Sequence, residues 1–129
     1  MTTDPVYRIT YYRIRPVVNE DEQAARVIHV RSGVEVRSAL DVPKYMNRRI
    51  AMTMAEAYMS VLDKAANVGK GGSNLIPVGA TGVVATGDSK GWNLVFETPQ
   101  GEVTVVVGEM DRAVKLAMRL AGVIARSKS

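Results

Sequence analysis

The chain has 129 residues, of which 47% are hydrophobic and 23% are charged, and this composition excludes a chain that is mainly disordered. It contains no cysteine, which excludes disulfides, thiolate metal sites and a cysteine nucleophile. The 17 lysines and arginines outnumber the 13 acidic residues, and the net charge of +4 is compatible with an anionic partner such as nucleic acid.

The N-terminal segment lacks the basic and apolar regions of a signal peptide, and no stretch approaches the roughly 18 consecutive apolar residues of a membrane-spanning helix. We therefore expect a cytoplasmic protein without a membrane segment. At this length we expect residues 1–129 to form one domain that folds without a metal or a disulfide.

In the first half, the pattern of apolar and polar residues predicts three strands and a helix. Pro16 confines the first strand to a sheet edge or ends it early, because proline has no N–H for pairing. Pro43 opens the helix, where a missing N–H costs nothing, and Gly69 stops it. The predicted elements are strands over 7–18, 24–31 and 33–40, and a helix over about 43–67.

Glycine dominates the segment that joins the two halves. Residues 69–91 hold seven of the 11 glycines, which predicts a flexible loop and a short strand near 82–86. Beyond it, Gly101 belongs to a turn between two strands, and Asp111 opens a last helix. These predicted elements are strands over 92–97 and 102–107, and a helix over about 111–127.

A hairpin followed by an amphipathic helix occurs twice along the chain. Ten residues separate the turn glycine from the residue that opens the helix in both copies, Gly33 to Pro43 and Gly101 to Asp111. The apolar positions of the helices also recur at a spacing of 67 residues. They are Met46, Ile50, Met54 and Ala57 in the first helix, and Ala113, Ala117, Ala121 and Ile124 in the second.

This repetition predicts an α+β fold: an antiparallel sheet of five or six strands built from two hairpin-plus-helix halves. The halves cover residues 6–68 and 82–127 approximately, and both helices are expected to pack on one face of the sheet. In the order of its elements the layout is similar to whirly-type single-strand binders and to PUR repeats. The similarity covers the element order alone and implies no site residue.

The predicted first strand interleaves tyrosine and arginine. Bases stack on aromatic rings and guanidinium planes while arginine holds phosphate, so this combination suits single-stranded nucleic acid. An edge strand with half-buried tyrosines is the alternative. Trp92, at the start of a strand, is a further candidate stacking platform, with core packing as the alternative. The candidates in the first strand are Tyr11, Tyr12, Arg13 and Arg15.

Two further cationic features could contact phosphates. The last helix carries a row of cations without an acid, for which a solvated face is the alternative. In Gly69–Ser73 the glycines follow a helix rather than a strand, so the segment favours a helix cap and mobile loop over a nucleotide-binding loop. Lys70 in this loop could still close over a polynucleotide backbone. The helix cations are Arg112, Lys115, Arg119 and Arg126.

The predicted first helix is apolar nearly all round, so more than one of its sides must be buried. Met52 and Met59 lie seven residues apart on a face that the core stripe leaves uncovered, and we predict that they form an oligomer interface. A central helix covered by the sheet is the alternative. The predicted core stripe consists of Met46, Ile50, Met54 and Val61.

No catalytic residue, metal site or cofactor is predicted, because His29 is the only histidine and the acidic cluster at 20–22 suits a solvated turn. We therefore expect a non-enzymatic homo-oligomer that binds single-stranded DNA or RNA with little sequence preference. The alternative is a structural or assembly protein, such as a viral or scaffold subunit, that self-associates through the methionine-rich helix. An enzymatic or small-molecule role ranks third.

Overall fold

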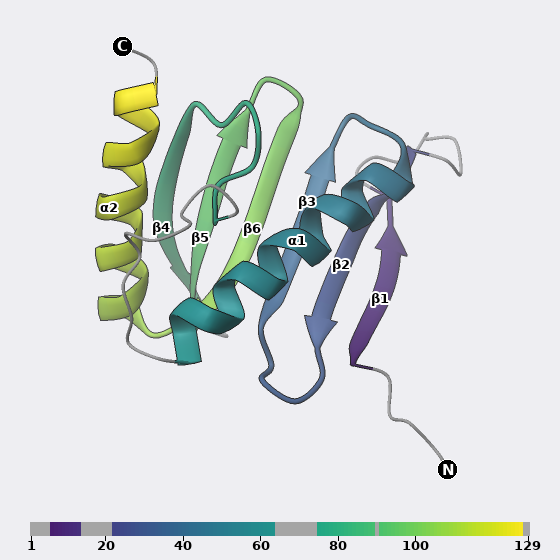
Figure 1. Ribbon diagram of the computed structural model, residues 1–129, viewed down its shortest axis with the longest axis horizontal. Coiled ribbons are helices and arrows are strands. Elements are labelled where there is room, and N and C mark those ends of the chain that lie inside the picture. The colour runs from purple at the N-terminus through teal and green to yellow at the C-terminus, as the bar shows by residue number, and fades with distance from the viewer. Residues whose placement is uncertain (1–5, 14–21, 64–74, 90, 128–129) are drawn as a thin grey trace.

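A computed structural model of the chain describes residues 6–13, 22–63, 75–89 and 91–127. Figure 1 shows the helices and strands in this part of the chain. In chain order they are β1 (Tyr7–Tyr12), β2 (Ala24–His29), β3 (Glu35–Leu40), α1 (Lys44–Asp63), β4 (Gly82–Asp88), β5 (Gly91–Thr98), β6 (Gly101–Gly108) and α2 (Met110–Ser127).

All six described strands belong to one antiparallel sheet, in the order β1-β2-β3-β6-β5-β4. Each half of the chain contributes three consecutive strands, and the halves meet where β3 pairs with β6 (Figure 1). The predicted α+β fold with an antiparallel sheet is therefore confirmed. The strands β1 and β4 form the two edges of the sheet.

Apart from the end of the first strand, the predicted boundaries that fall on described residues agree with the structure to within a few residues. The helix α1 begins at Lys44, and α2 begins at Met110, one residue before the predicted start. The strand β1 is an edge strand and ends at Tyr12, so the described part of this strand does not include Pro16, from which an edge position or an early end was predicted. Residues 14–18 of the predicted first strand, residues 64–67 of the predicted helix and the glycine-rich stretch from 69 to 74 lie outside the described residues.

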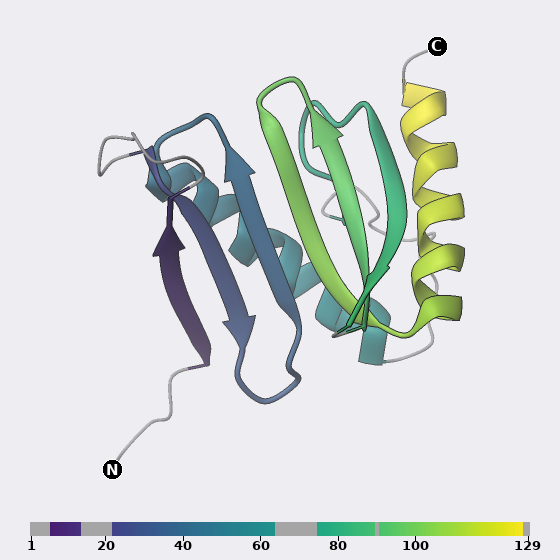
Figure 2. The same cartoon turned by 180° about the vertical axis from the view of Figure 1, so that it is seen from behind.

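One face of the sheet carries the core. Val27, Val36, Val105 and Leu94 lie side by side across β2, β3, β6 and β5, and all four are fully buried. The helix α1 packs on β2 and β3, and α2 packs mainly on β4 and β5. Residues of both helices join the same hydrophobic cluster. The helix α1 lies in front of the sheet in Figure 1 and behind it in Figure 2, so the opposite face is turned toward the reader in Figure 2.

The two helices repeat at a different spacing from the one predicted. Their buried positions lie 66 residues apart, not 67, and Met46 of the predicted core stripe is 39% exposed. The predicted spacing is wrong because it was based on apolar residues alone. Asn47 is polar, so this pattern omits it, although its side chain is fully buried and hydrogen bonded. The matching buried positions are Asn47, Ala51, Met54 and Tyr58 in α1, and Ala113, Ala117, Leu120 and Ile124 in α2.

Candidate functional site

The face of the sheet that both helices leave uncovered, here called the open face, carries the arginine and glutamate side chains of the strands together with several valines. Side chains alternate between the two faces of a strand, so residues one position away from the buried valines point to the open face. No described helix packs on it. Its central row, from β1 to β4, is Thr10, Arg26, Arg37, Thr104, Val95 and Val84.

Arg26 and Arg37 lie directly opposite each other on β2 and β3. Like charges in this position repel, and the carboxylate of Glu35 offsets the repulsion by binding both guanidinium groups. The Nε and Nη2 atoms of Arg26 donate to Glu35 at 2.8 and 3.1 Å, and Nε of Arg37 donates to it at 2.6 Å. We call Arg26, Glu35 and Arg37 the arginine clamp.

The side chains of the arginine clamp are hydrogen bonded to one another, and both guanidinium-bearing side chains are still partly exposed to solvent. The side chain of Glu35 is only 12% exposed, whereas those of Arg26 and Arg37 are 39% and 40% exposed. A guanidinium has five N–H donors. In the described part of the chain Glu35 engages two donors of Arg26 and one of Arg37, so the remaining donors stay available for an anion.

The electrostatics of the arginine clamp extend to Tyr12. Burial by itself raises the pKa of Glu35, but the hydrogen bonds from Arg26 and Arg37 outweigh it, so the pKa lies below its ordinary value. The hydrogen bond to Glu35 raises the pKa of Arg26. Burial raises the pKa of Tyr12, and the charges of all three clamp residues act on it. Tyr12 is therefore a neighbour of the arginine clamp on the open face, and 37% of its surface is exposed.

The other predicted binding residues of the first strand do not join this cluster. Tyr11 points to the helix face, where its hydroxyl accepts a hydrogen bond from Arg48 at 3.3 Å and its ring lies 5.2 Å from Nζ of Lys44. Arg13 follows the end of β1. Arg15 lies outside the described residues, as does Lys70 of the predicted glycine-lysine loop.

Trp92 and the cations of the last helix lie elsewhere. Trp92 is half-buried and packs against the hydrophobic core. The cations of α2 are exposed, but α2 covers the β4 edge of the sheet. Five strand spacings of about 4.8 Å separate that edge from β1, which is roughly 24 Å. Those residues of the predicted nucleic-acid site that the structure describes are thus distributed over separate surfaces.

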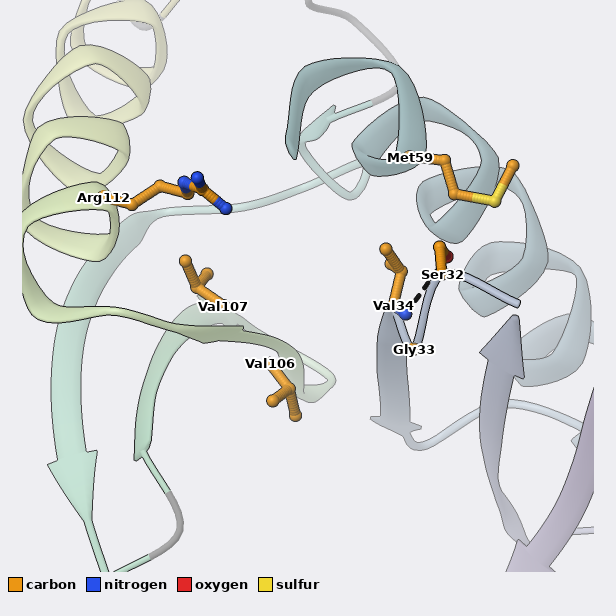
Figure 3. A pocket seen from close by; sticks show the side chains of 7 residues that line it. All are labelled: Ser32, Gly33, Val34, Met59, Val106, Val107 and Arg112. Carbon is orange, nitrogen blue, oxygen red and sulfur yellow. Dashed lines mark hydrogen bonds between the residues drawn. The ribbon is translucent and has the colours of Figure 1, made fainter. Parts of the chain in front are cut away.

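A small hollow of about 220 Å³ lies between the two halves, near the end of α1 and the start of α2 (Figure 3). Met59 and Val34 line one side of it, and Val107 and Arg112 line the other. Met52 and Met59 are both partly buried against the core. The oligomer interface predicted for these two methionines stays a prediction, and apolar side chains that are more exposed lie on α2.

Sequence reasoning missed the arginine clamp, although a signal for it was present. Arg26 and Arg37 are each the neighbour of a buried valine, Val27 and Val36, on two predicted strands, but only the register of β2 against β3 brings them together. His29 has a local role: its Nδ1 lies 2.7 Å from the Ser32 hydroxyl oxygen, and its ring packs edge-on against Tyr7. Among the described residues no group of three or more acidic or histidine side chains could hold a metal ion.

Comparison with known proteins adds no relative: no family model, curated protein or solved structure matches the chain. Neither helix in the described part of the chain has the length and apolarity needed to cross a membrane. Inferences about function therefore depend on the geometry of the open face.

Proposed function

We propose that this protein binds single-stranded nucleic acid, without catalysis, on the half of the open face formed by β1, β2 and β3. The observation that carries the proposal is the arginine clamp beside Tyr12. Its two guanidinium groups are fixed in place by one carboxylate and half-exposed, so they can bind phosphate oxygens with little further ordering. The ring of Tyr12 is placed to stack with a base.

The distribution of charge limits the proposed site to this half. Arg8 is exposed on β1 and adds a third cation to the same face. On the other half, Glu97 of β5 and Glu102 of β6 lie opposite each other and are both exposed. Two carboxylates repel a polyanion, so a bound strand would run along β1 to β3 and avoid this corner.

Phosphate contacts and stacking carry little sequence information, so we expect weak preference among sequences. Binding to a single strand weakens with salt, because each neutralised phosphate releases a counterion and contributes about −0.7 to the slope of log K against log salt. Three contacts, from Arg8, Arg26 and Arg37, predict a slope of roughly −2.

The test is a salt-dependent titration of a fluorescent oligonucleotide, with variants on two surfaces. The triple variant Arg26→Gln, Glu35→Gln and Arg37→Gln removes the arginine clamp without leaving a buried carboxylate unpaired. It should weaken binding and flatten the slope by about 1.4, the value for two lost contacts. The control Arg112→Gln with Arg119→Gln removes two cations from α2 and should leave the slope unchanged.

Two results would overturn the proposal. One is the absence of binding to any single strand at low salt. The other is a control variant that flattens the slope while the clamp variant does not, which would move the site to the cation row of α2.

A further inference from the structure

The charges on the open face separate into a positive half and a negative half. On the described strands β1, β2 and β3, three arginines of this face outnumber one glutamate. On β5 and β6, Glu97 and Glu102 lie opposite each other and are both exposed. The two halves meet where β3 pairs with β6. The charged residues of the positive half are Arg8, Arg26, Glu35 and Arg37.

Apolar side chains occupy the positions between these charges. Ile28 of β2, Val106 of β6 and Val95 of β5 point to the open face and are only partly buried. Val84 of β4 points the same way and is 47% exposed. When two sheets pack face to face, side chains of this kind interdigitate between layers about 10 Å apart. The open face can therefore pack on a second sheet as one layer of a β-sandwich.

We propose that a second copy of this chain covers the open face, so that the two sheets pack as a two-fold symmetric β-sandwich. In Figure 2 the second copy lies in front of the sheet. The two-fold axis lies between the sheets, parallel to the strands and over the junction of β3 and β6. Rotation about this axis places β2 of one copy over β5 of the other, and β3 over β6. Each positive half therefore covers the negative half of the other copy.

The charge pattern favours this partner in this orientation. An axis across the strands would place the two arginine clamps over each other, and like charges would repel. With the axis along the strands, Arg26 faces the strand that carries Glu97, and Arg37 faces the strand that carries Glu102. The glutamates lie two residues beyond the row of the arginines, an offset of about 7 Å that is shorter than the Debye length of about 8 Å at physiological ionic strength. The apolar contacts supply the affinity, and the charges select the orientation.

The area of the open face is sufficient for a specific dimer. Six strands spaced by about 4.8 Å, each at least six residues long, cover roughly 29 by 20 Å. Each copy thus buries about 600 Å² and the pair buries about 1,200 Å², which is the lower end of the range for specific interfaces. We therefore expect a dimer of modest affinity.

This dimer covers the arginine clamp, so a second copy and a single strand exclude each other on the open face. Self-association then regulates the nucleic-acid site, because each copy binds either a single strand or another copy. This regulation rests on the proposed function, whereas the dimer itself does not. The interface also differs from the one predicted for Met52 and Met59, since these residues lie on α1, on the other face of the sheet.

Sedimentation velocity over a wide range of protein concentration, without nucleic acid, tests the dimer. The wild type should reach 28.0 kDa, twice the 14.0 kDa of one chain. Glu102→Arg gives the negative half a cation that faces Arg37 of the other copy, and it should raise the dissociation constant by about tenfold or more. Glu109→Arg is the matched control, because it changes the net charge equally in the exposed connection from β6 to α2 and should leave the dimer intact.

A crosslinking experiment tests the orientation of the two copies. The chain contains no cysteine, so a single introduced thiol reports on one position. Thr104 lies on β6 beside the axis, where the Cα atoms of its two copies are about 11 Å apart, so a short bis-maleimide should join two copies of Thr104→Cys. Thr53→Cys, at an exposed position of α1, should not crosslink. If circular dichroism shows that Glu102→Arg is unfolded, this pair of cysteine variants decides the question.

Addition of a single-stranded oligonucleotide separates the dimer from the proposed function. The oligonucleotide should convert the wild-type dimer into complexes that hold one copy of the chain. A dimer that binds no oligonucleotide supports the sandwich and overturns the proposed function, whereas a dimer that stays intact with oligonucleotide bound overturns the regulation. A monomeric wild type at all concentrations, crosslinking through Thr53→Cys rather than Thr104→Cys, or dissociation only by Met52→Glu with Met59→Glu would overturn the sandwich itself.

Discussion

The side-chain amide of Asn47 forms hydrogen bonds with both main-chain groups of Leu40, as a neighbouring strand would. Its oxygen accepts from the Leu40 N–H at 3.1 Å, and its nitrogen donates to the Leu40 carbonyl at 3.1 Å. The same amide donates to the Gln23 carbonyl at 3.0 Å and accepts from the Ser38 hydroxyl at 2.8 Å. One buried residue of α1 thus joins the helix to the ends of β2 and β3.

Replacing Asn47 with alanine should destabilise the fold by about 2 kcal/mol or more, because the Leu40 N–H and the Gln23 carbonyl lose this partner at a cost of about 1–3 kcal/mol each. The Leu40 carbonyl keeps its hydrogen bond from the Val42 N–H. Urea unfolding measures this change. Asn93→Ala is the control, since its hydrogen bond to Asp88 is exposed and 3.4 Å long, and it should cost less than about 0.5 kcal/mol. Equal losses in the two variants would show that the Asn47 amide has no special role.

Gly101 lies where the two halves of the sheet meet, and it cannot be replaced without a backbone shift. It has φ of 141°, and a Cβ there would collide with the Ala39 carbonyl oxygen and lie 3.2 Å from Cα of Leu40. Gly101→Ala should therefore lower the unfolding free energy by more than about 2 kcal/mol. The control Gly82→Ala has open space around its Cβ and should change stability by less than about 0.5 kcal/mol. A stable Gly101→Ala variant would contradict the β3–β6 register.

Acid should weaken the fold through Glu35. Its pKa is lower in the folded protein than its ordinary value of 4.5, so its contribution to stability is complete above that value and is lost as pH falls through the folded pKa. Glu35→Gln lacks this titration, and its unfolding free energy should fall less steeply than that of the wild type below about pH 5. Thermal or urea unfolding across this range checks the difference. Parallel profiles would mean that the clamp carboxylate does not titrate with folding.

Tyr11 and Tyr12 are adjacent residues on opposite faces and provide a matched pair for nucleic-acid binding. Tyr12→Ala should weaken oligonucleotide binding by about 1–3 kcal/mol with an unchanged salt slope, because stacking releases no ions. Tyr11→Ala should leave affinity nearly unchanged, since this ring contacts Lys44 and Arg48 on the helix face. The reverse result would place the bound strand on the helix side of β1.

The sequence by itself determined the element order and the antiparallel α+β fold. These follow from local rules: periodicities of two and 3.6 residues, glycine at turns, and proline at a helix start. It also indicated the repeated hairpin-plus-helix unit, although the spacing of the helices was one residue off.

Only the tertiary structure decided which side chains act together. The arginine clamp requires the register of β2 against β3, which no local pattern encodes, because a slip of one residue moves every side chain to the other face. The burial of Asn47 likewise depends on main-chain groups up to 24 residues away. The tyrosines and helix cations looked like one site along the chain, but the sheet places β1 and α2 at its opposite edges. Residue composition and the spacing of apolar residues specify helices and strands, whereas strand pairing and helix packing decide which side chains share a surface.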